Sequence, residues 1–121
     1  MKQVLIIDDS PRIRERIAAL LAESRQIRIA GQAGNGRDAL DAVQRLKPDT
    51  VVLDIRLPDL SGIELLKTFK IRYPKMAVIM LTNLDDSRYR QQCRQLGADH
   101  FLSKTMEFEK IVDTIIDNPA H

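Results

Sequence analysis

Five short runs of apolar residues alternate along the chain with segments in which apolar side chains recur every three or four positions. The runs lack the alternation of polar and apolar residues that a half-exposed strand shows, so they predict strands that are buried on both faces. The predicted strands are Val4–Ile7, Ile27–Ala30, Val51–Leu53, Ala77–Leu81 and Phe101–Leu102.

Each segment between these runs has a single apolar stripe at helical spacing, which predicts an amphipathic helix with one buried face. The stripes are Ile13, Ile17, Leu20 and Leu21; Leu40, Val43 and Leu46; Leu66, Phe69 and Tyr73; Tyr89, Cys93 and Leu96; and Phe108, Ile111, Val112 and Ile115. Ser10 followed by Pro11 predicts the start of the first helix, and Ser61 predicts the start of the third. Gly97 predicts the end of the fourth.

Strand and helix alternate five times with short connections, which predicts a doubly wound α/β domain with a parallel sheet. Ligands of such sheets bind beyond the carboxyl ends of the strands. Four of the apolar runs are followed there by polar residues, namely Asp8 and Asp9, Asp54, Thr82, and Lys104. If the first strand is central and the third lies beside it, Asp9 and Asp54 face each other across a crevice.

Carboxylates that converge in a partly dry crevice repel one another, and a hard cation with oxygen ligands relieves that repulsion. We therefore expect the acidic residues to hold a divalent cation. Mg²⁺ suits the site best, because it accepts a small number of carboxylates and keeps positions for water and phosphate oxygens.

Composition narrows the possible classes of protein. A chain of 121 residues with 44% hydrophobic and 30% charged residues is typical of one globular domain. Its net charge of +2 is too small to indicate nucleic acid as an electrostatic partner. The single cysteine, Cys93, cannot form an internal disulfide, and no apolar run is long enough to span a membrane. We expect a cytoplasmic protein without a membrane partner.

The ordered set of strand-end residues resembles the receiver domain of two-component response regulators. The stretches VLIIDDS, VVLDIRLPDLSGIELL and LGADHFLSK match that family in order and spacing over essentially the whole chain. An aromatic residue three positions before Lys104 is a further family mark, and Phe101 fills it. The resemblance implies one receiver domain over residues 1–121, with a flavodoxin-like (βα)5 fold and strand order 2-1-3-4-5.

The resemblance also implies a role for each site residue. Asp54 would be the nucleophile that takes a phosphoryl group from a histidine kinase, a phosphotransfer protein or a small acyl phosphate. The ligands of Mg²⁺ would be Asp8, Asp9, Asp54 and the main-chain carbonyl of Arg56. Lys104 would pair with the phosphoryl charge, and Thr82 would hydrogen-bond the product. Thr82 and Phe101 would then switch the surface of the fourth helix, fifth strand and fifth helix, which controls a partner protein or an output domain.

The chain departs from the common family pattern in three places. Thr105 follows Lys104 where many members have proline, which puts a cis peptide there in doubt. Asn83 stands where a small residue is frequent, and its bulk would narrow the approach of the phosphoryl group. Arg56 occupies a variable position that influences phosphoryl lifetime in the family, and its effect on this chain is left open.

Other functions are weaker alternatives. A flavodoxin-like nucleotide or flavin binder would need a first loop rich in Gly, Ser and Thr, whereas DDSPR repels phosphate in the absence of a metal. A phosphatase with an aspartate nucleophile would usually have a second acid where Arg56 stands. A non-phosphorylated scaffold receiver is disfavoured because the acidic set is complete. Only residues 118–121 follow the fifth helix, so we expect no effector domain here, whether the chain stands alone or comes from a longer regulator.

Arginines gather on two of the predicted helices. Arg88, Arg90 and Arg94 lie on a polar face of the fourth helix, which is usually solvated and is alternatively a surface for an acidic partner. Arg12, Arg14 and Arg16 lie on the first helix near the acidic residues, where members of the family dock their kinase.

Overall fold

The computed structural model describes residues 1–84 and 86–119. In these residues five parallel strands form one sheet in the order β2-β1-β3-β4-β5. The strands are β1 (Lys2–Ile7), β2 (Ile27–Ala33), β3 (Thr50–Leu53), β4 (Ala77–Thr82) and β5 (His100–Ser103). The helices are α1 (Pro11–Ala22), α2 (Gly36–Leu46), α3 (Gly62–Arg72), α4 (Ser87–Gln95) and α5 (Ile111–Asp117), the last preceded by the 3₁₀ turn η1 (Phe108–Lys110). The predicted fold class and strand order are confirmed.

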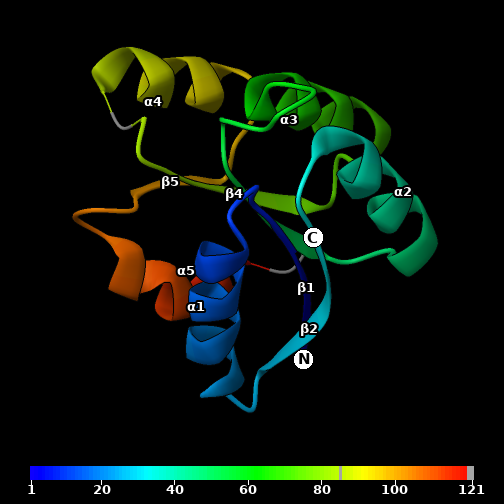
Figure 1. Cartoon of the computed structure of the whole chain (residues 1–121), viewed down its shortest axis with the longest axis vertical. Helices are drawn as coiled ribbons and strands as arrows, with labels where there is room; N and C mark the ends of the chain where they lie inside the picture. The colour runs from blue at the N-terminus through cyan, green and yellow to red at the C-terminus, as the bar shows by residue number, and fades with distance from the viewer. Residues whose placement is uncertain (85, 120–121) are drawn as a thin grey trace.

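The helices form two layers, with α2, α3 and α4 on one face of the sheet and α1 and α5 on the other (Figure 1). Successive residues of β1 point to opposite faces, so the strand contributes to two cores. Leu5 and Ile7 pack in the core under α2 and α3, while Val4 and Ile6 pack in the core under α1 and α5. This double burial explains why the run contains no polar residue.

Burial on both faces holds for β1, β3 and β4 but is wrong for the two edge strands. The last four residues of β1 and all of β3 and β4 are buried, whereas β2 and β5 contain partly exposed positions. The helical layers give less cover at the edges of the sheet. β2 also continues to Ala33, three residues beyond the prediction, and its register with β1 shifts between Val4 and Leu5.

The predicted helix ends are found where the sequence placed them. The Ser10 hydroxyl accepts a hydrogen bond from the Ile13 N–H at 3.2 Å, and the Ser61 hydroxyl accepts one from the Ile63 N–H at 3.1 Å. Gly97, just beyond α4, has a φ of 99°, a left-handed conformation that favours glycine.

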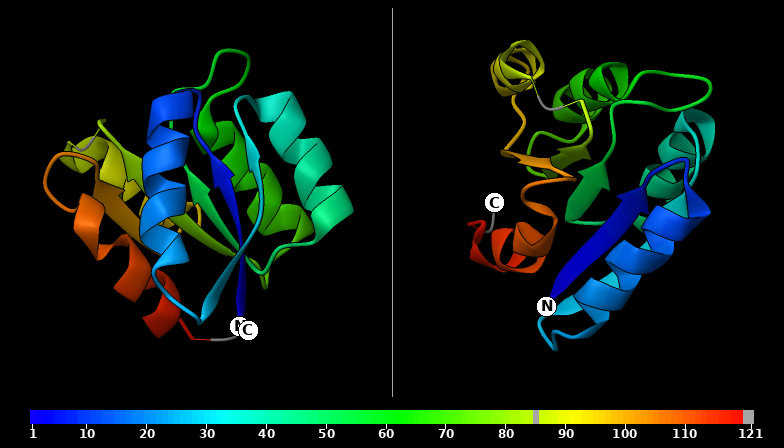
Figure 2. Two further views of the ribbon diagram at one scale, coloured as in Figure 1. Left: turned by 60° about the horizontal axis from the view of Figure 1, so that its bottom comes forward. Right: turned by 60° about the vertical axis from the view of Figure 1, so that its left-hand side comes forward.

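All strands run in the same direction, so their carboxyl ends meet at one edge of the sheet (Figure 2). Asp8, Asp9, Asp54 and Lys104 follow these ends, and Thr82 is the last residue of β4. Among the described helices, none combines the length and the apolar character that crossing a membrane requires.

Candidate functional site

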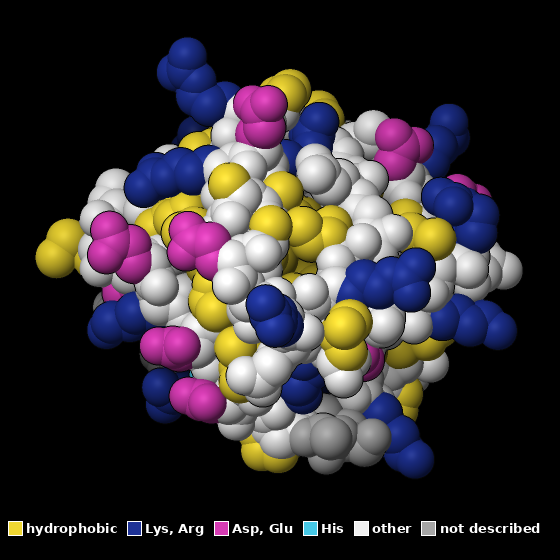
Figure 3. Space-filling model, turned by 90° about the horizontal axis from the view of Figure 1, so that it is seen from below, with side chains coloured by type: hydrophobic (Ala, Val, Ile, Leu, Met, Phe, Trp, Pro, Cys, Tyr) yellow, Lys and Arg dark blue, Asp and Glu magenta, His cyan; other side chains and the backbone are white. Residues whose placement is uncertain are grey.

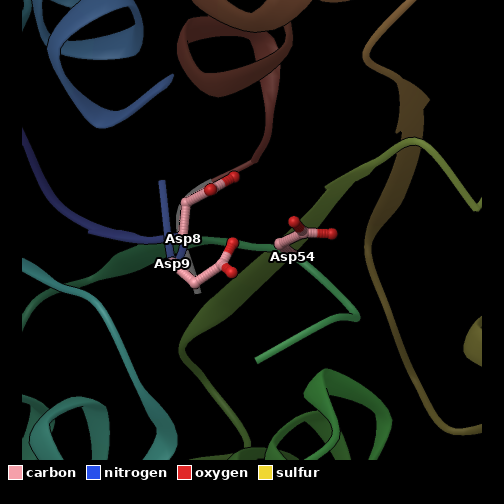
Figure 4. A group of neighbouring side chains, drawn as sticks. All are labelled: Asp8, Asp9 and Asp54. Atoms are coloured by element: carbon pink, nitrogen blue, oxygen red, sulfur yellow. The ribbon is translucent and has the colours of Figure 1, made fainter. Parts of the chain in front are cut away.

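Three carboxylates converge at the carboxyl ends of β1 and β3. Asp8, Asp9 and Asp54 each offer an oxygen within 4.8 Å of the other two. The Asp9 side chain reaches toward Asp54 from the neighbouring strand end (Figure 4). The parallel pairing of Ile7 with Leu53 explains this arrangement, because it aligns the ends of the two strands.

Asp8 is the most deeply buried of the three acids, with 1% of the residue exposed. One carboxylate oxygen, Oδ1, accepts a hydrogen bond from the Ser10 N–H at 3.0 Å. The other, Oδ2, lies 2.5 Å from the Lys104 ammonium group. Burial raises the pKa of Asp8, and the hydrogen bonds from Lys104 and Ser10 only partly offset this effect.

Asp54 is held at the end of β3 by its backbone and its carboxylate. Its N–H donates to the Ile7 carbonyl at 3.1 Å, and its Oδ1 accepts from the Ile55 N–H at 2.7 Å. Its Oδ2 accepts a hydrogen bond from Lys104 at 2.8 Å. The residue is 6% exposed, so its carboxylate lies at the floor of the site.

Lys104 bridges two of the acids. Its ammonium nitrogen contacts both Asp8 and Asp54, and 8% of its side chain is exposed. Burial alone would lower the pKa of Lys104, but the two carboxylates outweigh burial and leave the pKa raised. The amine is therefore charged at neutral pH and neutralises part of the acidic site.

An open cleft of about 440 Å³ gives access to these groups. Its lining includes Asp9, Arg56, Thr82 and Asn83 as well as the buried acids and Lys104. The Thr82 hydroxyl accepts a hydrogen bond from the Leu84 N–H at 3.1 Å, and the residue is 1% exposed. Asn83 is exposed at the rim. In the described residues every peptide bond is trans, including the one between Lys104 and Thr105.

Phe101 is half-buried on β5, and an arginine of α4 lies over its ring. The Arg90 guanidinium is 4.9 Å from the ring centroid and donates to the Phe101 carbonyl at 3.1 Å. It also donates to Glu107 at 2.6 Å, and Glu107 accepts from the Ser103 N–H at 3.1 Å. The expected solvated face of the fourth helix holds only in part for Arg90, because 38% of its side chain is exposed while its guanidinium connects α4 to the segment after β5.

Two arginines of α1 also make intramolecular contacts. Arg14 donates to the main-chain carbonyl of Asp8 at 2.6 Å, and the Arg16 guanidinium lies 4.0 Å from the centroid of the Phe108 ring. Arg12 is exposed. Arg14 supports the turn that carries the acidic pair, a role that its sequence position alone did not reveal.

Sequence reasoning missed two residues that shape the loop after β3. Gly62 packs against the site backbone so closely that a Cβ there would lie 1.9 Å from the Asp54 carbonyl oxygen. Asp59 accepts hydrogen bonds from the N–H groups of Gly36 and Arg37 at the start of α2. Neither contact has a local signal, because each joins segments whose approach depends on the fold.

The donor set fits Mg²⁺. The side-chain oxygens come from three carboxylates, which are the hard ligands that this cation prefers, and the cleft leaves room for water. Arg56 lines the same cleft, so its main-chain carbonyl is a candidate fourth ligand. An entering cation would have to compete with the Lys104 ammonium for the oxygens of Asp8 and Asp54.

Comparison with known proteins points to one family. The family model of the response regulator receiver domain matches residues 4–116. Protein CcdB of Bacillus subtilis is 36% identical over 115 residues, which are 95% of each chain. The response regulator domain of Thermotoga maritima CheB has a TM-score of 0.85 and 28% identity, and the match covers 98% of this chain and 99% of that one.

A second solved structure that matches this chain is a complex that includes Mg²⁺. The CheX-CheY-BeF3-Mg+2 complex of Borrelia burgdorferi matches with a TM-score of 0.88 and 25% identity, covering 95% of this chain and 87% of that one. Other curated relatives are longer. The chain spans 28% of a Treponema denticola protein-glutamate methylesterase/protein-glutamine glutaminase and 53% of the Bacillus subtilis transcriptional regulatory protein LnrK.

Proposed function

The chain belongs to the response regulator receiver family, and on this premise we propose that it is a phosphoacceptor switch in which Asp54 is phosphorylated in a Mg²⁺-dependent reaction. The observation that carries the proposal is the convergence of Asp8, Asp9 and Asp54 with the ammonium group of Lys104. The signalling role belongs to the family. The role of each residue is our proposal.

Phosphoryl transfer to Asp54 requires an oxygen nucleophile and neutralisation of the incoming negative charge. A carboxylate oxygen of Asp54 forms the new P–O bond, and the bond from phosphorus to the donor nitrogen or acyl oxygen breaks. Lys104 already contacts Asp54 Oδ2, so its ammonium group is placed to stabilise the phosphoryl oxygens. Bound Mg²⁺ would supply further charge neutralisation, with Asp8, Asp9, Asp54 and the Arg56 carbonyl as its protein ligands.

We propose that Thr82 and Phe101 transmit the effect of Asp54 phosphorylation from the site to the surface of the domain. The Thr82 hydroxyl now accepts from the Leu84 N–H, and turning toward a phosphoryl oxygen would release that amide at the start of the segment leading to α4. Phe101 lies on the neighbouring strand under Arg90 of α4. A shift of these contacts would alter the surface formed by α4, β5 and α5.

The phosphoryl donor is proposed to be a histidine kinase or a phosphotransfer protein that docks near α1. This face shows apolar side chains among charged ones (Figure 3). Partly exposed apolar residues on this side of the sheet include Ile13, Leu20, Val112 and Ile116. Such a mixture suits a transient protein partner. We propose that the exchange takes place in the cytoplasm, without a role for membrane or nucleic acid.

The output is proposed to be a partner protein or a further domain. LnrK, of which the chain spans 53%, is a transcriptional regulatory protein, whereas CcdB has nearly the same length as this chain. Both arrangements are compatible with a surface switch. We do not assign the methylesterase activity of the longer relatives to this chain, because it spans only about a quarter of those proteins.

The test is phosphorylation by acetyl phosphate, followed by intact mass. We expect one added phosphoryl group with Mg²⁺, and none with a chelator or in Asp54→Asn. Asp49→Asn is the matched control, because Asp49 precedes the same strand at its opposite end. A mass gain that persists in Asp54→Asn would place the acceptor elsewhere, and no gain in the unaltered chain would contradict the proposal.

A further inference from the structure

One exposed side chain ties the loop after β3 to the start of α2. Asp59 Oδ1 accepts hydrogen bonds from the N–H groups of Gly36 at 2.7 Å and Leu60 at 2.8 Å. Its Oδ2 accepts from the Arg37 N–H at 3.0 Å. The N–H groups at a helix start have no partners within the helix, so the carboxylate satisfies two of them. Hydrogen bonds from these amides, that of Gly36 foremost, lower the pKa of Asp59.

The same loop borders the proposed metal site. Arg56 lines the cleft, and the base of the loop is closed by a hydrogen bond from the Gly62 N–H to the Ile55 carbonyl at 2.7 Å. At the far end, Leu60 packs so close to α2 that a Cβ on Gly36 would lie 2.8 Å from the Leu60 Cβ. The loop is thus held at both ends, and residues 56–58 span the interval between them.

We propose that Asp59 is a positioning residue for the magnesium site. Its hydrogen bonds to the N–H groups of Gly36 and Arg37 fix the loop after β3 and thereby position Arg56, which lines the cleft, so that its main-chain carbonyl can act as a ligand. The inference rests on the proposed function, since it assumes that Mg²⁺ binds among the three acids. Coupling between two sites is reciprocal. Mg²⁺ binding should therefore also change the environment of the Gly36 and Arg37 amides at the start of α2, which donate hydrogen bonds to Asp59.

Asp59→Asn tests the hydrogen bonds of Asp59 to the start of α2 with little change in side-chain volume. The amide nitrogen of asparagine cannot accept a hydrogen bond, so at least one of the amides of Gly36, Arg37 and Leu60 loses its partner. The matched control is Asp38→Asn. Asp38 lies in the first turn of α2, and its Oδ2 accepts from the Asn35 side chain rather than from the loop. Both changes remove one negative charge, so a general electrostatic effect would appear in both.

The first measurement is Mg²⁺ affinity by calorimetry. We expect Asp59→Asn to weaken binding about 3- to 10-fold, less than the 10- to 100-fold typical of a residue that directly orients a ligand. Asp38→Asn should stay within about twofold, because exposed charges are screened. Phosphorylation by acetyl phosphate should return to nearly the original rate in Asp59→Asn at saturating Mg²⁺, which separates positioning from a general loss of structure.

The second measurement is the amide spectrum during the same titration. Mg²⁺ should shift the signals of Gly36 and Arg37 in the unaltered chain and in Asp38→Asn, and these shifts should vanish in Asp59→Asn. Equal Mg²⁺ affinity in Asp59→Asn and the unaltered chain would overturn the proposed positioning role of Asp59. Equal weakening in Asp59→Asn and Asp38→Asn would overturn it as well. A failure of the unaltered chain to bind Mg²⁺ would instead overturn the proposed function itself.

Discussion

The ammonium group of Lys104 lies between Asp8 and Asp54, at 2.5 Å and 2.8 Å from their carboxylate oxygens. Three acids so close together would repel one another strongly if none were paired. Lys104 reduces that repulsion. Burial nevertheless raises the pKa of Asp8, because the contacts with Lys104 and Ser10 offset only part of the lost hydration of this carboxylate.

The identity of residue 62 also affects the stability of the fold, because Gly62, the first residue of α3, packs directly against the backbone of Asp54. Gly62→Ala should lower the free energy of unfolding by about 1–3 kcal/mol, since the added Cβ would overlap the Asp54 carbonyl and no side-chain rotation relieves the overlap. Urea unfolding measures the loss. Gly31→Ala is the control, because its Cβ would come close to the end of the flexible Leu46 side chain and would otherwise meet Leu5 at an ordinary contact distance. Similar losses in both variants would contradict this explanation.

At the scale of elements, α4 is attached to the rest of the molecule by few buried side chains. Cys93 is its only described residue that is fully buried. Arg90 adds contacts to Phe101 and Glu107, and Glu107 in turn accepts from the Ser103 N–H just before Lys104. These contacts connect the surface of α4 to Ser103, the residue before Lys104, and we propose that the switch acts through them.

The Arg90 contact predicts a pH dependence. The hydrogen bond from Arg90 lowers the pKa of Glu107 below its ordinary value of 4.5, so the contact stabilises the fold above about pH 4.5 and loses this effect as pH falls through the lowered pKa. In Arg90→Met, a carboxyl-carbon NMR titration should show the pKa of Glu107 moving back toward 4.5.

Urea unfolding of the same variant should show a stability deficit below about 1 kcal/mol at pH 7, because the pair is partly exposed. The deficit should shrink at pH 3. Arg94→Met, which alters an exposed arginine of the same helix, should leave the titration of Glu107 nearly unchanged. An unchanged titration in Arg90→Met would contradict the assignment.

For the whole molecule, the acidic site lies on the inner strands, between the two cores. β1 contributes to both cores and is followed directly by Asp8 and Asp9, while Asp54 directly follows β3 beside it. A cation that binds these carboxylates and relieves their mutual repulsion should therefore stabilise the entire domain, because a ligand that binds only the folded state shifts the unfolding equilibrium.

Mg²⁺ at about 100 times its Kd should raise the free energy of unfolding by about 2.7 kcal/mol. Asp9→Asn should lose most of this gain, because it removes the exposed carboxylate that faces Asp54. Urea unfolding with and without Mg²⁺, at constant ionic strength, measures the difference. Asp113→Asn changes an exposed acid of α5 and should keep the gain. An equal gain in Asp9→Asn would exclude this site as the source.

The elements were predictable where local pattern and tertiary environment agree. The inner strands lie under two helical layers, so their uninterrupted apolar runs identify them directly. The edge strands receive less cover, and β2 accordingly continues past its apolar run through Gly31 and Gln32. The strand-end positions of Asp8, Asp9, Asp54, Thr82 and Lys104 also followed from the pattern, while their roles stay predictions.

The sequence by itself determined which residues form the strands, which side chains follow them and, through its family motifs, what chemistry to expect. This information is local, because it depends on periodicity and on spacing along the chain. Only the tertiary structure decided that Lys104 bridges two acids, that Arg90 lies over Phe101 and that Asp59 clamps α2. These contacts join residues from different elements, and their geometry depends on how the helices and loops pack around the sheet.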